Sequence, residues 1–333
     1  MTPRLWRDLE SNGRRLSDSA KAVREEAERR VAAVKEMVTQ GKEVVSGDRI
    51  LVIGYDTDHD KHTYSGLPSE CFVYPGDVVT MIDGVDCTGR FEAFLHAPFR
   101  DHCAGERNET SIAMQVSLID GSGTGQVLLF GDLSHDTIMK IVEITTGNQH
   151  ADRLAWDVLL APHHCSKFVM YVDDELQQDV LDALEDAAEP AGCVVSSSHP
   201  IPDTDEPTAN PPHRKAADRY AEIAAFHCTM EHGSTDAPTP IVFEVDTSGM
   251  RLLEPELVEA SARSVEKAFT AAPSRLGLVA AAAARYAQEK SAASPAWRRT
   301  RTRTPGADRI GQAIIRDRGG QAAPSTPIGF GAR

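Results

Sequence analysis

The spacing of apolar residues divides the chain into a helical start and a β-rich middle. Between Ser17 and Gln40 the sequence is charged and Ala-rich, and its apolar residues recur at helical spacing. This pattern predicts one long helix that ends near Gly41. From Asp48 onward the sequence has short β-like segments that are separated by Gly and Pro. These segments are Arg49–Gly54, Cys71–Tyr74, Asp77–Ile82 and Phe91–Leu95.

Further along, strands alternate with helices. Two predicted strands, Ser111–Ile119 and Gln126–Phe130, flank the Gly-rich segment 120–125, which indicates a hairpin. The elements expected after it are a helix over 134–145, a strand over 156–161, a helix over 173–188, a strand over 192–197, a helix over 215–226 and a strand over 241–245. Strands that meander first and then alternate with helices predict a layered domain of the α/β (α+β) class.

These patterns predict four segments. Residues 1–45 form a charged helical segment, and residues 46–253 form the α/β domain. Residues 254–294 are Ala-rich and predict a helical extension. Residues 295–333 are rich in Arg, Gly, Pro and Thr, which is typical either of a disordered terminus or of an Arg-rich arm that contacts nucleic acid or an acidic partner.

Composition narrows the class of protein. The 333 residues are 41% hydrophobic, which is enough for a substantial core. The formal net charge of −15 argues against a protein that coats nucleic acid, although a nuclease stays open because a bound metal supplies local positive charge. We expect no membrane-spanning segment, because no apolar stretch is long enough. The 6 cysteines include no C-x-x-C pair, so we expect a reduced, cytoplasmic protein.

Candidate chemistry begins at the end of the predicted strand Gln126–Phe130. Gly131 and Asp132 follow it directly, and a carboxylate at the carboxyl end of a buried strand is well placed to bind a metal. The alternative is that Asp132 caps the helix that follows, with Ser134 as another cap.

Four histidines lie at the ends of later predicted elements. His163 and His164 are adjacent on the turn after the strand 156–161, where one imidazole can bind a metal while the other transfers a proton. His213 precedes a predicted helix and is either a functional residue or a capping or surface residue. His199 follows the strand 192–197 and has the same two interpretations.

Taken in order, these features resemble the ComEC-type branch of the metallo-β-lactamase superfamily. The matching motifs are Asn108-Glu-Thr-Ser111, Gly131-Asp132, Asp157-Val-Leu-Leu-Ala-Pro-His-His-Cys-Ser166 and, one residue shorter than in that branch, Asn210-Pro-Pro-His213. They cover about Phe91 to Phe226, which is under half of the chain. The His-His motif in this context is fairly specific, whereas Gly-Asp alone is weak.

The resemblance implies a β-sandwich flanked by helices, with up to two zinc ions, or another divalent metal, at one edge. Asp132 would match a bridging carboxylate, and His164 a late metal ligand with His163 aiding proton transfer. His213 would match a histidine that faces the substrate or its phosphate. Asn108 and Ser166 are further candidates within the motifs. The implied reaction is hydrolysis of a phosphodiester, nucleic acid included, by a metal-activated water.

Two departures qualify the resemblance. The superfamily motif H-x-H-x-D-H is absent, and under the resemblance this implies a domain that lacks part of its N-terminal half. The segment from Asp56 to His62 has suitable ligand types in another order, with Asp58, His59 and His62 as candidates, or it is a solvated acidic loop. Cys165 replaces the Gly of the His-His motif, and it either packs as a small apolar residue or joins the site.

Three hypotheses follow. The leading one is a zinc-dependent hydrolase of the metallo-β-lactamase fold. The second is a non-catalytic or split-subunit remnant that acts as a binding module, with a partner chain that supplies the missing half-domain. The third is a domain that binds one metal for structure only. Because half a sandwich would expose apolar sheet surface, we expect helices or a partner to cover it.

Overall fold

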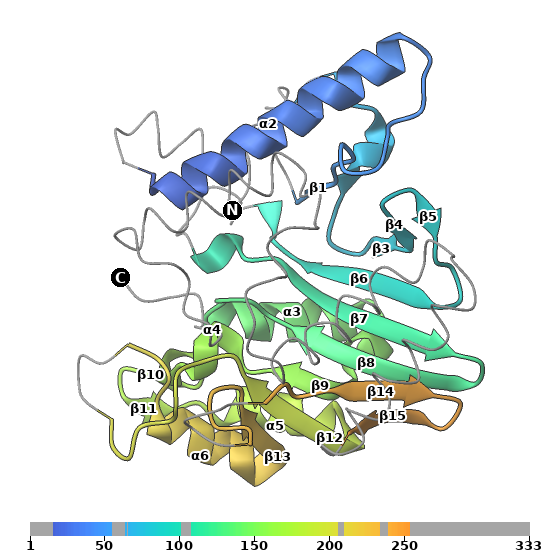
Figure 1. Ribbon diagram of the computed structural model, residues 1–333. Coiled ribbons are helices and arrows are strands. Elements are labelled where there is room, and N and C mark those ends of the chain that lie inside the picture. Colours follow the sequence, from blue (N-terminus) through green and yellow to red (C-terminus); the bar gives the residue numbers. More distant parts are fainter. Residues whose placement is uncertain are drawn as a thin grey trace, which may run out of the picture.

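A seven-stranded mixed sheet forms the centre of the molecule (Figure 1). The structure is a computed structural model that describes residues 16–54, 64, 66–100, 108–205, 210–233 and 239–253. The strand order is β13-β12-β9-β8-β7-β6-β3. The strands are β3 (Val78–Val79), β6 (Phe91–Ala97), β7 (Ala113–Asp120), β8 (Gly123–Leu129), β9 (Trp156–Leu160), β12 (Ala188–Ser196) and β13 (Ala225–Cys228). Strands β8, β9, β12 and β13 are parallel, and β7, β6 and β3 continue the sheet in antiparallel pairs, which makes the domain mixed α/β.

Three helices cover one face of this sheet, as Figure 1 shows. They are α3 (His135–Gly147), α5 (Gln178–Asp186) and α6 (Arg214–Ile223). Their apolar faces meet Leu128, Leu159 and Val194 of the sheet in one fully buried cluster. Trp156 is completely buried there and donates its indole N–H to the carbonyl oxygen of Leu184 over 3.0 Å. Each large apolar side chain buried in this way contributes about 1.5–3 kcal/mol.

A hairpin packs on the opposite face of the sheet. It consists of β14 (Phe243–Asp246) and β15 (Gly249–Leu252), and it encloses a second apolar cluster with Val158, Cys193 and Val195. Gly125 in β8 allows this close approach, because a Cβ there would lie 2.4 Å from the Met250 methyl carbon. The sheet is therefore covered in part on both faces by this chain itself.

The helix expected over 17–40 is confirmed as α2 (Asp18–Thr39). Ser17 caps it by accepting the N–H of Ala20 over 3.2 Å, and Gly41 ends it with φ of +64°. Its residues Val31 and Val34 pack in a separate apolar cluster with the segment that follows the helix. That segment contains the parallel pair β1 (Val52–Ile53) and β2 (Phe72–Val73), the 3₁₀ turn η1 (Ser69–Cys71) and the hairpin of β4 (Met81–Ile82) and β5 (Val85–Asp86).

The hairpin β7–β8, the helix α3 and the strands β9 and β12 also confirm the sequence-based expectations, within a few residues at their ends. The helix predicted over 173–188 is wrong in its first turn and begins only at Gln178. Asp173 and Asp174 have φ of 51° and 63° and form the turn between β10 (Tyr171–Val172) and β11 (Glu175–Leu176). Asp is one of the residues that tolerate this left-handed conformation best, so the acidic pair marks a hairpin turn.

The helix predicted over 215–226 is also too long. It ends at Ile223, and Phe226 belongs to β13, which pairs in parallel with the edge of β12. Pairing with an open sheet edge overrides the helical pattern there. The segments 254–294 and 295–333 lie outside the described residues, as do residues 1–15. No helix among the described residues is long and apolar enough to cross a membrane.

Candidate functional site

The candidate residues gather at one edge of the sheet because the parallel strands end there. Asp132 follows β8, His163 and His164 follow β9, and Ser197 follows β12. The 3₁₀ turn η3 (Asn108–Thr110) reaches the same edge, since it precedes β7 and β7 runs antiparallel to β8. This is the edge at which open α/β sheets place their ligands.

Gly131 forms the tight turn after β8 that contacts both neighbouring segments at this edge. Its φ is +60°, and a Cβ on it would lie 2.7 Å from the Cβ of Ser111, so no other residue fits without a shift. Its carbonyl oxygen accepts the backbone N–H of His163 over 2.8 Å. The next backbone N–H, of Asp132, donates to the hydroxyl of Ser111 over 3.1 Å. These two hydrogen bonds attach the Gly131-Asp132 turn to the segment before β7, through Ser111, and to the turn after β9, through His163.

The histidine pair lies in a strained turn. His163, His164 and Cys165, in the short helical turn α4 (Pro162–Cys165), have φ of 49°, 56° and 64°. Three consecutive left-handed residues that are not glycine cost about 1–2 kcal/mol each, and such strain is concentrated at functional sites. Cys165 has the left-handed backbone conformation that glycine adopts most readily, and it stands where the His-His motif has Gly. Its side chain is fully buried in the core, and burial raises the pKa of its thiol to about 12, so it packs as a small apolar residue.

His164 and Asp132 form the central pair of the site. Nδ1 of His164 lies 2.9 Å from the carbonyl oxygen of Ser197 and must donate its proton to it, because a carbonyl only accepts. In the neutral ring this leaves the lone pair on Nε2, which lies 3.6 Å from Oδ1 of Asp132. A carbonyl that orients the other ring nitrogen is the usual support of a metal-binding histidine.

A second His–Asp pair in the molecule has a different geometry. His135 brings Nε2 to 3.0 Å from Asp179 and Nδ1 to 2.9 Å from Asp136, so both ring nitrogens can donate to carboxylates. Burial lowers the pKa of His135, but its hydrogen bonds to the two aspartates outweigh burial and raise it overall. Both carboxylates thus lie within hydrogen-bond distance of the His135 ring, whereas Nε2 of His164 lies 3.6 Å from Asp132, within ion-pair distance but longer than a good hydrogen bond.

His163 lies beside this pair. Its Nε2 is 3.5 Å from the side-chain nitrogen of Asn108, a long hydrogen bond in which the amide donates. Burial lowers the pKa of His163, the charge of Asp132 opposes that shift, and His164 and His213 lower it further. The ring is therefore favoured in its neutral form and lies within electrostatic reach of all three residues.

Glu109 is a site-edge residue that the motif analysis did not single out, although it stands inside Asn108-Glu-Thr-Ser111. Its carboxylate accepts the backbone N–H of Ser134 over 3.3 Å and the hydroxyl of Thr137. Ser134 is the N-cap residue of α3 but makes no side-chain cap bond, so Glu109 supplies the cap from another segment. Asp132 does not have the capping role that was its alternative interpretation.

His213 is buried, with 1% of its surface exposed, and its ring makes no cap for α6. Its Nδ1 accepts the backbone N–H of Lys167 over 3.2 Å, so the ring proton is on Nε2. Its backbone N–H donates to the carbonyl oxygen of Cys165 over 3.0 Å. The cap of α6 comes from Asp205, whose carboxylate accepts the N–H of Lys215 over 3.0 Å.

The remaining candidates have other positions. Ser166 is fully buried and caps the 3₁₀ turn η5 (Lys167–Val169) by accepting the N–H of Phe168 over 3.3 Å. His199 is exposed, and its backbone carbonyl accepts the hydroxyl of Ser198 over 2.9 Å. Asp58, His59 and His62 lie outside the described residues. Ser197 was missed because a backbone carbonyl has no sequence signal.

The donor atoms partly fit a metal ion. Two ligand atoms bound tetrahedrally to zinc at about 2.0–2.1 Å lie about 3.4 Å apart, close to the 3.6 Å between Nε2 of His164 and Oδ1 of Asp132. Within the described part of the chain, however, no group of three or more His, Cys, Asp and Glu side chains is arranged to hold a metal. The described residues thus offer two candidate ligands, Asp132 and His164, where a zinc site needs at least three.

Comparison of the chain with models of known protein families, with curated proteins and with solved structures finds no match. The function is therefore argued from the site.

Proposed function

We propose that the protein is a metal-dependent hydrolase of phosphodiesters, nucleic acid included, with zinc as the metal. The observation that carries this proposal is the pair of Asp132 and His164. At 3.6 Å, Nε2 of His164 and Oδ1 of Asp132 are too far apart for a good direct hydrogen bond, and their separation is close to that of two ligand atoms on one zinc ion. The contact of His164 Nδ1 with the carbonyl oxygen of Ser197 favours this ring orientation.

Each site residue has a role in this proposal. Asp132 and His164 would hold the metal, and the carbonyl oxygen of Ser197 orients the His164 ring. A bound zinc ion lowers the pKa of a coordinated water and so supplies hydroxide at neutral pH. His163, whose lowered pKa favours the neutral ring, accepts or returns a proton beside the pair. His213 supports the turn that carries His163 and His164, because its Nδ1 accepts the backbone N–H of Lys167 and its own backbone N–H donates to the carbonyl oxygen of Cys165.

We also propose the finer fold: the seven-stranded sheet, with β14–β15 on its second face, is part of a metallo-β-lactamase-like sandwich that lacks part of its N-terminal half. Support comes from the order of the motif-bearing turns along the chain and from their meeting at one sheet edge. The left-handed backbone at Cys165, where the family has Gly, adds to this support.

A second candidate function is a binding module, either a non-catalytic remnant or one subunit of a split protein. The observation that favours it is the incomplete ligand set in the described ranges. In that case a partner chain supplies the missing ligands, and the isolated chain turns over no substrate.

Hydrolysis of bis(p-nitrophenyl) phosphate and of single- and double-stranded DNA tests the two candidates. The hydrolase predicts zinc-stimulated turnover that a chelator removes and that Asp132→Ala and His164→Ala each lower about 100-fold or more. Asp179→Ala, which breaks the other His–Asp pair, serves as the matched control and retains turnover. Absence of turnover with zinc or manganese would reject the hydrolase and favour the binding module.

A further inference from the structure

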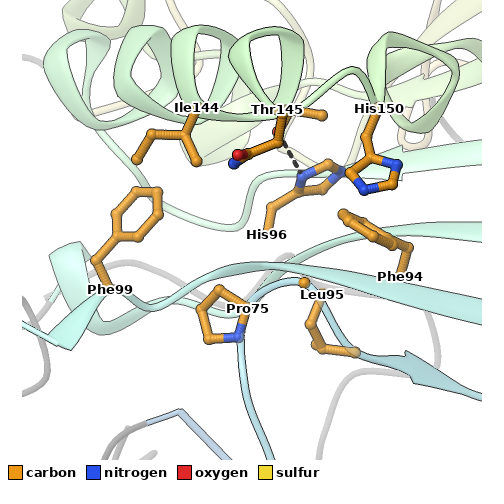
Figure 2. Close-up of a pocket in the computed structure, with 10 residues that line it drawn as sticks. Pro75, Phe94, Leu95, His96, Phe99, Ile144, Thr145 and His150 are labelled. Atoms are coloured by element: carbon orange, nitrogen blue, oxygen red, sulfur yellow. Dashed lines mark hydrogen bonds between the residues drawn. The ribbon is translucent and has the colours of Figure 1, made fainter.

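A cavity lies at the opposite end of α3 from the candidate site. It has a volume of about 290 Å³ and lies between β6, the C-terminal end of α3 and the segment around Pro75 (Figure 2). Asp132 precedes the start of α3, and the helix is about 18–20 Å long at 1.5 Å per residue. The cavity is therefore separate from the Asp132–His164 pair.

The walls of the cavity are mostly apolar and aromatic. Figure 2 shows Phe99 facing Ile144 at one end and Phe94 below His150 at the other. Pro75 and Leu95 form the opposite wall from α3. None of the residues that line the cavity is Asp, Glu, Lys or Arg. A charged ligand would lose its hydration there without an ion-pair partner among the lining residues. Behind the lining, the Lys140 ammonium lies 4.8 Å from the centroid of the Phe99 ring and the Arg153 guanidinium 5.4 Å from that of Phe94.

The hydrogen bonds of the cavity determine which of its polar atoms donate and which accept. Nε2 of His96 lies 3.0 Å from the carbonyl oxygen of Arg153 and donates to it, so Nδ1 accepts the hydroxyl proton of Thr145 over 3.2 Å. The oxygen of Thr145 is left with acceptor lone pairs. Burial lowers the pKa of His96 to about 4, which keeps the ring neutral. Asn148 adds one amide donor and one amide acceptor.

We infer that this cavity binds an uncharged planar heteroaromatic ring of nucleobase size. Its volume is at the lower limit of the roughly 300–1,000 Å³ of pockets for drug-sized ligands, which favours a ring over a whole nucleotide. Aromatic side chains stack on such rings, and the Thr145 acceptor with the Asn148 amide matches a ring edge that has both N–H donors and acceptor nitrogens. The inference is independent of the proposed hydrolase.

Free adenine is the probe, titrated against the full chain and followed by ligand-observed NMR, with the anion benzoate as the comparison ligand. We expect saturable binding of adenine with a Kd of about 1 mM or tighter and much weaker binding of benzoate. Asp132→Ala leaves adenine binding unchanged, which separates this cavity from the candidate site.

Two variants locate the binding. Ile144 is 39% exposed at the cavity, so Ile144→Trp fills the space and weakens adenine binding by about tenfold or more. Val38→Trp, at a similarly exposed position of α2, is the matched control and has no effect. Asn148→Leu leaves the cavity open and weakens binding about fivefold. Absence of saturable binding, equal binding of benzoate, or binding unchanged in Ile144→Trp would overturn the inference.

Discussion

The backbone N–H of His163 donates to the carbonyl oxygen of Gly131 over 2.8 Å, and this bond joins the ends of the parallel strands β8 and β9. It connects the two turns that carry the candidate ligands. Asp132 and His164 are each the next residue along the chain from one partner of the bond. The spacing of the metal-facing atoms therefore depends on the Gly131 turn.

Gly131→Ala should destabilise the protein by about 2–4 kcal/mol, because the new Cβ meets Ser111 and the backbone is left-handed there. Chemical denaturation measures the change. Gly147 is the matched control, since a Cβ on it has nothing within 4 Å and it lies at the end of α3. Gly147→Ala should leave stability unchanged or raise it by up to about 1 kcal/mol. Equal effects of the two substitutions would contradict the role of Gly131.

Glu109→Ala should lower stability by about 1–2 kcal/mol, because Ser134 and Thr137 lose their acceptor and α3 loses its N-terminal cap. The exposed Glu143 lies on the same helix, and Glu143→Ala should change stability by about 0.5 kcal/mol or less. Thermal or urea unfolding of both variants makes the comparison. A small effect at Glu109 would mean that the cap comes from elsewhere.

Tyr220→Phe should be neutral or stabilising by up to about 1 kcal/mol. The hydroxyl of Tyr220 is buried and has no hydrogen-bond partner among the described residues. Its burial costs hydration free energy that no hydrogen bond offsets, and the substitution removes this cost. The hydroxyl of Thr145 is buried with His96 as its partner, and Thr145→Val should cost about 1–3 kcal/mol. A destabilised Tyr220→Phe would show that this hydroxyl makes a stabilising contact.

Glu26 makes α2 sensitive to acid. Hydrogen bonds from Arg29, and then from Arg30, outweigh the opposing effect of burial and together lower the pKa of its carboxyl from 4.5 to about 2. Since the folded-state pKa is the lower one, the stabilisation is present above pH 4.5 and is lost as the pH falls towards 2. Glu26→Gln should therefore destabilise the protein at pH 7, and its difference from the wild type should shrink at pH 3. The exposed Glu36, changed to Gln, is the control in the same helix.

The sequence predicted the elements that position the site better than it predicted the contacts within it. The order of β7, β8, α3, β9 and β12 follows from apolar spacing and glycine positions, and it brings Asp132 and His164 to one edge. The prediction of a helix over 173–188 was wrong at its start, because Asp173 and Asp174 adopt left-handed turn conformations. Strand β13 was not predicted, because that segment becomes a strand by pairing with β12.

Contacts made by the backbone could not be predicted. The carbonyl oxygens of Ser197 and Gly131 orient His164 and His163, but every residue has a carbonyl and its direction depends on tertiary structure. The capping role of Glu109 joins residues 25 positions apart in the sequence, beyond the reach of local capping patterns. The resemblance to the metallo-β-lactamase superfamily stays a prediction.

The measurement that tests the central claim most directly is metal content by mass spectrometry on protein purified without added zinc. We predict about one or two zinc ions per chain, lost in Asp132→Ala and in His164→Ala and retained in Asp179→Ala. A chain without zinc, or zinc retained after Asp132→Ala, would contradict a metal site between Asp132 and His164.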